Sequence, residues 1–442
     1  MSTAHHHILP LPRTVFFHWI ILGTIVVILY HSVFYSTFQL EWDDQWQVFN
    51  PMTENGLTSE NLQQIFGELY GRQYSPINQL YYTLLYQIDG YNPTLFHIGN
   101  LLFHVLNVFA VYTLSAFIFF RFKQENSTRQ MAFFSSLLFA IHPIQVESVC
   151  WISASKVVLS TFFYLMALLL YLRYATSEKH KKILLTGSVC CALLSMGCKE
   201  QAVTLCLSLF LADLFIIRRN MRNFKIYLEK IWFIIPAIIF ALVSQIANDG
   251  ASEDTIGYTL PDRIIFFFYS LFRYLMQSLL PFKLSYLYPF PYQVGEDIPA
   301  TLWIYPFVIL FVGYLIYQYR RQSILMFCAG FFLLNLLPML HIVPLPRYFI
   351  IADRYLYLPY AAFSICLVWF ATAYWQTKYK YLLISSIIYL GYLGGYTLWY
   401  TPFWKDSPTL KHHFREILKQ RGIESKESQS DKKEIKYDSH EQ

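Results

Sequence analysis

The chain has 442 residues, of which 55% are hydrophobic and only 14% are charged, and its mean hydropathy is +0.36. This composition excludes an ordinary soluble protein and predicts an all-α polytopic membrane protein, because apolar runs of about 17–25 residues, long enough to cross a bilayer, recur along the chain. The net charge of +6 comes from residues that flank these runs, so it does not indicate a nucleic-acid partner.

The apolar runs alternate with basic loops, and the cytoplasmic loops of membrane proteins carry most of their Lys and Arg. With the N-terminus inside, 17 of the 34 Lys and Arg residues fall on the inner side and only eight fall in outer loops. The segment 263–280 looks like a further span, but counting it as one would place Arg320 and Arg321 outside. These two residues are inside only if 263–280 lies along the outer interface or re-enters the membrane from that side. We therefore expect about 11 spans, near 14–36, 97–120, 131–148, 156–174, 183–197, 201–217, 231–247, 301–318, 324–341, 357–375 and 381–400.

These spans form one predicted transmembrane domain, residues 1–400. It has a first outer loop at 37–96 and a second at 248–300 that contains the interfacial helix. The charged tail, 401–442, predicts a short helix at 408–419 followed by disorder. The seven cysteines lie in or beside apolar segments, so a disulfide framework is not expected.

The first outer loop opens with QLEWDDQWQ (39–47), in which Asp43 and Asp44 stand side by side between Trp42 and Trp46. The tryptophans suit a membrane interface. The next stretch, TSENLQQIFGELYG (58–71), predicts an amphipathic helix lying flat on the outer leaflet. A small soluble loop domain is the alternative.

A polar stripe follows one face of the second span. His97, Asn100, His104 and Asn107 recur at helical spacing. Hydrogen bonds to neighbouring helices are the simpler interpretation, and a wet cavity is the alternative. His97 and His104 are about 10 Å apart along the axis, which is too far for joint metal binding.

Charged residues gather where the spans meet the predicted outer face. In HPIQVESVCWISASK (142–156), Pro143 should bend the third span near its outer end. The segments CKEQ (198–201) and PLPRYFIIADRYLYLP (344–359) add further charges there. Ordinary pairs, such as Glu147 with Lys156, would also explain some of these residues. The residues so placed are His142, Glu147, Lys156, Lys199, Glu200, Arg347, Asp353 and Arg354.

A carboxylate pair opposite scattered cations, beside lipid, fits sugar transfer from a lipid phosphate. The leaving phosphate needs cations and no general acid, whereas the acceptor hydroxyl needs a base that one carboxylate can supply. A transporter or lipid flippase is the first alternative, but it predicts charges near the bilayer midplane and two related halves. A non-catalytic protein that keeps the fold is the second.

Several motifs occur in the order of a known family: EWDDQWQVFNP, HPIQVESVCWISASKVVLS, CKEQAVTL, LLPFKLSYLYPF, ADRYLYLP and WKDSPTL. From about residue 40 to 415 the chain resembles the membrane part of the transmembrane and tetratricopeptide-repeat O-mannosyltransferases and their bacterial relatives. These are C-type glycosyltransferases, related to the protein O-mannosyltransferases. In two respects the chain departs from the family pattern. Many relatives have an arginine at the position of Ser75, and Arg72 could take the place of that arginine. The tetratricopeptide repeats that normally follow WKDSPTL are absent from this sequence.

The resemblance implies a C-type fold and a polyprenyl- or dolichyl-phosphate sugar donor used on the outer or lumenal face. It assigns Asp43 as the base and Asp44 as its support, and it favours Arg354 and Lys199 as donor-phosphate ligands. Lys156 and Arg347 are further candidates for the phosphate. Residues expected to support the site are Arg72, His142, Glu147, Glu200, Asp353, His97 and Asn100.

Some features of the expected activity stay open at this point. The acceptor could be a glycan, a lipid or a protein, and a divalent cation is left open as a cofactor. The one Asn-x-Ser/Thr site, at Asn126, falls on the predicted inner side. This favours a bacterial inner membrane, with the endoplasmic reticulum as the eukaryotic equivalent.

Overall fold

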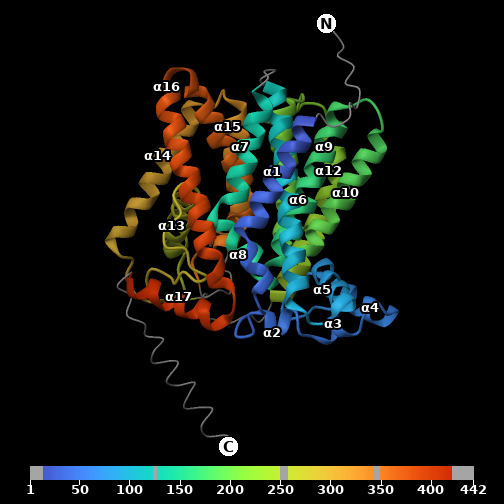
Figure 1. Cartoon of the computed structure of the whole chain (residues 1–442). Helices are drawn as coiled ribbons and strands as arrows, with labels where there is room; N and C mark the ends of the chain where they lie inside the picture. The colour runs from blue at the N-terminus through green and yellow to red at the C-terminus, as the bar shows by residue number, and fades with distance from the viewer. Residues whose placement is uncertain (1–12, 123–126, 249–256, 343–348, 421–442) are drawn as a thin grey trace, which may run out of the picture.

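The computed structural model of the chain describes residues 13–122, 127–248, 257–342 and 349–420 (Figure 1). Its longer helices are α1 (Arg13–Leu29), α5 (Pro76–Asp89), α6 (Pro93–Phe122), α7 (Thr128–Ile141), α9 (Ser155–Thr176), α10 (Lys181–Cys198), α12 (Lys225–Asn248), α13 (Leu260–Leu279), α14 (Ile304–Gln318), α15 (Ser323–Leu336), α16 (Tyr357–Tyr400) and α17 (Ser407–Gln420). Shorter α-helices are α2 (Asp44–Gln47), α3 (Pro51–Glu54), α4 (Ser59–Gly67), α8 (Val146–Cys150) and α11 (Leu205–Leu211). The described residues contain no β-strand, only two isolated bridges.

The apolar helices occupy the predicted spans. Eight described segments are long and apolar enough to cross a membrane, and a bent pair makes a ninth. Two shorter apolar helices, Arg13–Leu29 and Ser323–Met339, fall on the two remaining predicted ranges. The long helix α16 carries two of the eight, Asp353–Ala373 and Tyr379–Trp404. The chain is a multi-pass integral membrane protein, and the predicted all-α polytopic fold class is confirmed.

The bent pair is the third predicted span. α7 ends at Ile141, and the segment from Pro143 to Cys150 turns away from it by 53°. His142 makes the break, because its extended backbone and the proline that follows cannot continue the helix. The predicted bend at Pro143 is therefore confirmed.

The helix α13 covers most of 263–280 and is not among the segments suited to crossing. It is amphipathic, with one side buried at Ile265, Phe266, Ser270, Leu271, Tyr274 and Gln277. In Figure 1 it lies between α14 and α16, and the Tyr389 hydroxyl of α16 donates to the carbonyl of Leu279 at 2.6 Å. This placement is consistent with the prediction from Arg320 and Arg321 that 263–280 is not an ordinary span.

The polar stripe on α6 lies inside the bundle. Asn100 donates to the carbonyl of Trp151 at 3.0 Å, and Asn107 donates to that of Val158 at 2.9 Å. The His104 ring lies 2.7 Å from the hydroxyl of Tyr357 on α16. The interpretation as hydrogen bonds between helices is confirmed. These bonds fix α6 against three neighbouring segments.

The predicted outer loop and tail lie at one end of the molecule. Helices α2 to α5 and α17 share the end opposite the start of α1 (Figure 1). The amphipathic helix α4 buries Ile65 against this loop, whereas Phe66 and Leu69 are exposed. The tail after residue 420 lies outside the described residues, as does Arg347.

Candidate functional site

A cavity of about 510 Å³ lies where the first loop meets the ends of the bundle helices. Its walls come from the first loop, from the segments after α8 and α10, from α12, and from the turn before α16. Pro338 and Met339, which follow α15, complete the lining, so segments far apart in the chain meet here. The charged residues that line it are Asp43, Arg72, Lys156, Lys199, Glu200 and Arg354.

The C-terminal segment holds the acidic stretch in place. The backbone N–H of Thr37 donates to the Lys405 carbonyl at 2.8 Å. The buried Gln39 amide donates to the Trp404 carbonyl at 2.8 Å and accepts from the Ser407 hydroxyl at 3.1 Å. These bonds fix the turn that leads into Asp43.

Asp44 is fully buried and does not line the cavity. One carboxylate oxygen accepts from the Gln39 backbone N–H at 2.7 Å, and the other accepts from the backbone N–H of Ser153 at 2.9 Å and from its hydroxyl. Burial raises the pKa of Asp44 to about 6, although these hydrogen bonds favour the charged form. The side chain thus connects the first loop to the start of α9.

Asp43 has a different environment from its neighbour. Its side chain is half-buried and lines the cavity. The indole N–H of Trp46 lies 3.4 Å from its Oδ1. This long contact leaves the carboxylate able to accept a proton from a group in the cavity.

Lys156 reaches the cavity from the first turn of α9. Its ammonium group donates to the side-chain oxygens of Gln73, at 2.8 Å, and Gln47, at 3.3 Å. Glu147, considered above as an ordinary partner for Lys156, pairs with Arg354. Two neutral amides thus contact this ammonium and orient it.

Arg354 is held by Glu147 and by three aromatic rings. Glu147 accepts from the Arg354 backbone N–H at 2.9 Å and pairs with its guanidinium. The guanidinium carbon lies 5.3, 5.0 and 5.1 Å from the ring centres of Trp151, Phe349 and Tyr355. Such packing fixes the orientation of a planar cation that can bind phosphate through two N–H groups.

Lys199 follows α10 directly, and its side chain is mostly buried. Its ammonium group lies 5.1 Å from the ring centre of Tyr355. Lys199 and Arg354 also line a smaller cavity of about 30 Å³, whose lining includes Asn335. Both cations are therefore positioned in one wall, and an anion in the main cavity could contact both.

The remaining predicted residues divide between the cavity and the protein interior. Arg72 is exposed at the cavity mouth, in a left-handed backbone conformation with φ of 59°. Glu200 is half-buried in the wall. His97 lies 3.4 Å from the Thr37 carbonyl, and Asn100 bonds Trp151 as described above.

His142 and Asp353 also lie outside the cavity lining. His142 accepts from the Ile144 backbone N–H at 3.3 Å, and its ring centre lies 4.2 Å from that of Tyr360. Asp353 accepts from the Tyr288 hydroxyl at 2.9 Å. Both residues join loop segments to α16 or its start.

Several lining residues were not among the predicted site residues. Gln73 and Trp46 follow the acidic pair in the first loop, and Ser244 and Gln245 come from the apolar helix α12. The polar spacing within α12 could have indicated a wet side. No three His, Cys, Asp or Glu side chains within the described ranges are arranged to hold a metal ion.

Comparisons with known proteins give relatives of one kind. No protein-family model matches the chain. It is 30% identical over 153 residues to Protein O-mannosyl-transferase TMTC2 of Homo sapiens, covering 34% of this chain and 17% of that protein. It is 25% identical over 355 residues to Protein O-mannosyl-transferase F38B6.6 of Caenorhabditis elegans, covering 73% of this chain and 47% of that protein.

Solved structures of an oligosaccharyltransferase from Archaeoglobus fulgidus are also similar. The form tethered to an acceptor peptide is 13% identical, with a TM-score of 0.47 over 92% of this chain and 55% of that chain. The apo form is 14% identical, with a TM-score of 0.46 over 92% of this chain and 56% of that chain. The chain spans about half or less of the length of the curated relatives described above. Over the matched regions the resemblance found in the motifs is confirmed: the chain is similar to the protein O-mannosyl-transferases.

Proposed function

We propose that this chain is an inverting glycosyltransferase that moves a sugar from a polyprenyl- or dolichyl-phosphate donor to an acceptor hydroxyl. The observation that carries the proposal is one cavity in which Asp43 shares the lining with four basic side chains, Arg72, Lys156, Lys199 and Arg354. A carboxylate and a group of cations are the two components that this reaction needs.

In the proposed reaction the acceptor oxygen attacks the anomeric carbon from the side opposite the phosphate. The bond from that carbon to the phosphate oxygen breaks, and its electron pair stays on the phosphate. The hydroxyl proton passes to Asp43. Lys199 and Arg354 hold the phosphate as its charge grows, and Lys156 and Arg72 contribute further positive charge.

Glu147 has a separate proposed role, as a positioning residue. It bonds both the backbone and the side chain of Arg354, while its own side chain is almost fully buried. It therefore fixes the direction in which the guanidinium faces without meeting the donor. Asp44 acts in the same way on the loop that carries Asp43.

The names of the relatives favour mannose as the transferred sugar and a protein hydroxyl as the acceptor. A glycan or lipid acceptor remains the alternative, since the chain matches only part of those proteins. We place the cavity on the periplasmic or lumenal face. The lack of an Asn-x-Ser/Thr site on the predicted outer side favours a bacterial inner membrane.

The proposal predicts different defects for the base and for a phosphate ligand. Asp43→Asn nearly preserves shape but removes the base, so the purified protein should bind mannosyl polyprenyl phosphate normally. It should transfer the sugar at least about a hundredfold more slowly. Lys199→Gln should weaken donor binding about ten- to a hundredfold, because one charge-assisted contact is lost. Both are measured as donor binding and single-turnover transfer in detergent.

Lys405→Gln is the matched control, because Lys405 is exposed on the same end of the molecule and does not line the cavity. It should behave like the natural protein in both assays. Normal transfer by Asp43→Asn would exclude Asp43 as the base. Unchanged donor binding in Lys199→Gln would remove this lysine from the proposed phosphate site.

A further inference from the structure

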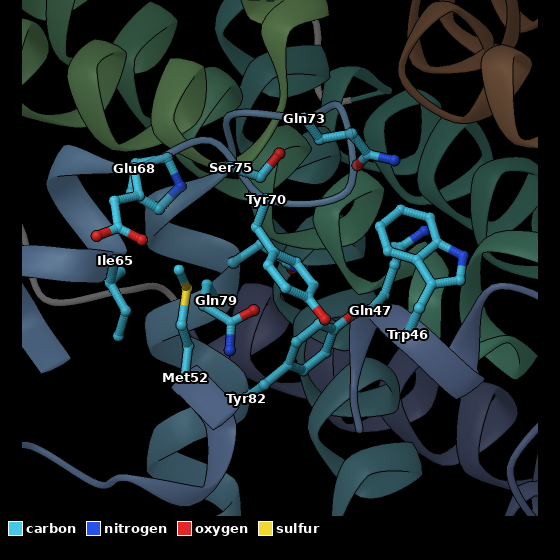
Figure 2. A pocket seen from close by; sticks show the side chains of 12 residues that line it. Trp46, Gln47, Met52, Ile65, Glu68, Tyr70, Gln73, Ser75, Gln79 and Tyr82 are labelled. Atoms are coloured by element: carbon cyan, nitrogen blue, oxygen red, sulfur yellow. The ribbon is translucent and has the colours of Figure 1, made fainter. Parts of the chain in front are cut away.

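Another pocket lies beside the cavity of Asp43, within the first outer loop (Figure 2). Its volume is about 40 Å³. Trp46 and Gln73 line both spaces, so the two share a wall. In Figure 2 the side chains of Gln47, Tyr70 and Tyr82 approach one another across this pocket.

The lining of this side pocket is mainly aromatic and uncharged polar. It includes four side-chain amides, of Gln47, Gln73, Asn78 and Gln79, and the rings of Trp46, Tyr70 and Tyr82, with Glu68 as its one carboxylate. A lining of amides and rings without basic groups does not suit a phosphate. It suits a neutral ligand that both donates and accepts hydrogen bonds.

Two polar atoms in this lining have no hydrogen-bond partner among the described residues. They are Nε2 of Gln47, a residue that is only 6% exposed, and Oγ of Ser75. By contrast, the amide of Gln79 donates to the Thr53 hydroxyl at 2.9 Å. Buried polar groups are usually paired, so these two atoms are available to a polar ligand group that enters the pocket.

We infer that this side pocket binds hydroxyl groups of a carbohydrate ring, a conclusion that rests on the proposed function. A sugar hydroxyl can accept from Gln47 Nε2 and donate to Ser75 Oγ, while the rings of Trp46 and Tyr70 pack against its C–H groups. A volume of about 40 Å³ has room for two or three water-sized groups and not for a whole sugar ring. The ring itself then lies in the larger cavity.

The position of the pocket allows two sources for this ring. It is either the sugar that the donor carries or the sugar of a glycan acceptor, since both must lie next to Asp43 during transfer. The chemistry recognised is the same in both cases. The two sources differ in which substrate binds more weakly when the pocket is altered.

Two substitutions test the pocket. Ser75→Ala removes only the hydroxyl, and Gln47→Met keeps the length of the side chain but removes its amide. Dissociation constants are measured in detergent for mannosyl polyprenyl phosphate and for polyprenyl phosphate without sugar. The ratio of the two constants cancels any effect that Gln47→Met transmits through Lys156 to the phosphate. The Michaelis constant for methyl α-mannoside as acceptor is measured in parallel.

If the pocket holds the donor sugar, each variant should bind the mannosylated probe about two- to tenfold more weakly, the value of one neutral hydrogen bond. The sugar-free probe should be unaffected in Ser75→Ala. If the pocket holds an acceptor sugar, both donor constants should stay unchanged and the Michaelis constant for methyl α-mannoside should rise by a similar factor. Either result supports carbohydrate recognition here.

Gln277→Met and Ser278→Ala are the matched controls, because both residues are buried in α13 and neither lines the side pocket. They should leave all three constants unchanged. Suppose that the natural protein binds the mannosylated probe and that both pocket variants have the same three constants as the natural protein. The inference of carbohydrate binding in this pocket is then wrong, while the proposed function stands. If the natural protein binds neither polyprenyl probe, the proposed function itself fails and this inference fails with it.

Discussion

Asp43 and Asp44 are adjacent in the chain, yet their side chains lie in different environments. Asp44 accepts three hydrogen bonds in a fully buried site, and Asp43 lines the cavity with one long contact to Trp46. Their divergence follows from the turn that ends at Asp43, after which α2 begins. Two like charges can therefore be neighbours here without sharing one proton.

The environment of Asp44 predicts a pH-dependent stability. Burial raises its pKa from 3.8 to about 6 in the folded chain. Between about pH 4 and pH 6 the folded chain then binds more protons than the unfolded chain, so this group's contribution to stability falls as the pH rises through that window. The loss amounts to about 3 kcal/mol. It is measured as the thermal unfolding midpoint in detergent across this pH range.

Asp44→Asn should flatten this part of the profile. Asp43→Asn is the control and should keep the natural slope, since it leaves Asp44 intact. Equal slopes for the natural protein and Asp44→Asn would show that another group controls stability in this window.

The C-terminal helix is the element that holds the acidic stretch. The ring of Phe414 in α17 lies 4.8 Å from that of Tyr286, which in turn lies 4.6 Å from that of Trp42. Together with the bonds from Trp404 and Ser407 to Gln39, this aromatic series ties three distant segments together. The orientation of Asp43 thus depends on residues more than 350 positions further along the chain.

Removing the Phe414 ring should therefore loosen the first loop. Phe414→Ala leaves a cavity at a residue only 4% exposed, and such changes cost about 3–5 kcal/mol. We expect faster amide hydrogen exchange in residues 37–47 and a lower turnover number, with donor binding changed less. Phe414→Leu, which fills most of the space, should restore slow exchange. Slow exchange in Phe414→Ala would show that α17 does not control the loop.

At the scale of the whole molecule, the distribution of basic residues predicts its orientation. The end that carries α2 to α5, α17 and the cavity should face the periplasm or lumen, and the loop near residue 225 should face the cytoplasm. A reporter active only outside the cytoplasm should work after residue 410 and stay silent near residue 225. The reverse pattern would place the cavity in the compartment where the proposed donor chemistry is not expected.

Membrane thickness explains why the sequence alone determined so much of this architecture. Each span must be long and apolar, and each cytoplasmic loop tends to be basic, so local composition predicts spans, order and orientation. The bend at Pro143 is equally local, because it follows from the chemistry of one residue. The acidic pair and most of the cations around it were found in the same way, from charges that do not fit an apolar chain.

The partners of these charges depended on tertiary structure. One alternative left open by the sequence paired Glu147 with Lys156, nine positions away, but Glu147 pairs with Arg354, more than 200 positions further on. The sequence assigned Asp44 only a supporting role, and it could not show that packing against Ser153 buries this side chain. Which charges meet is decided by how the helices pack, and that packing sums many weak contacts between segments distant in the chain. Composition therefore determined that this end of the molecule carries a charged site, and only the fold decided which side chains face the cavity.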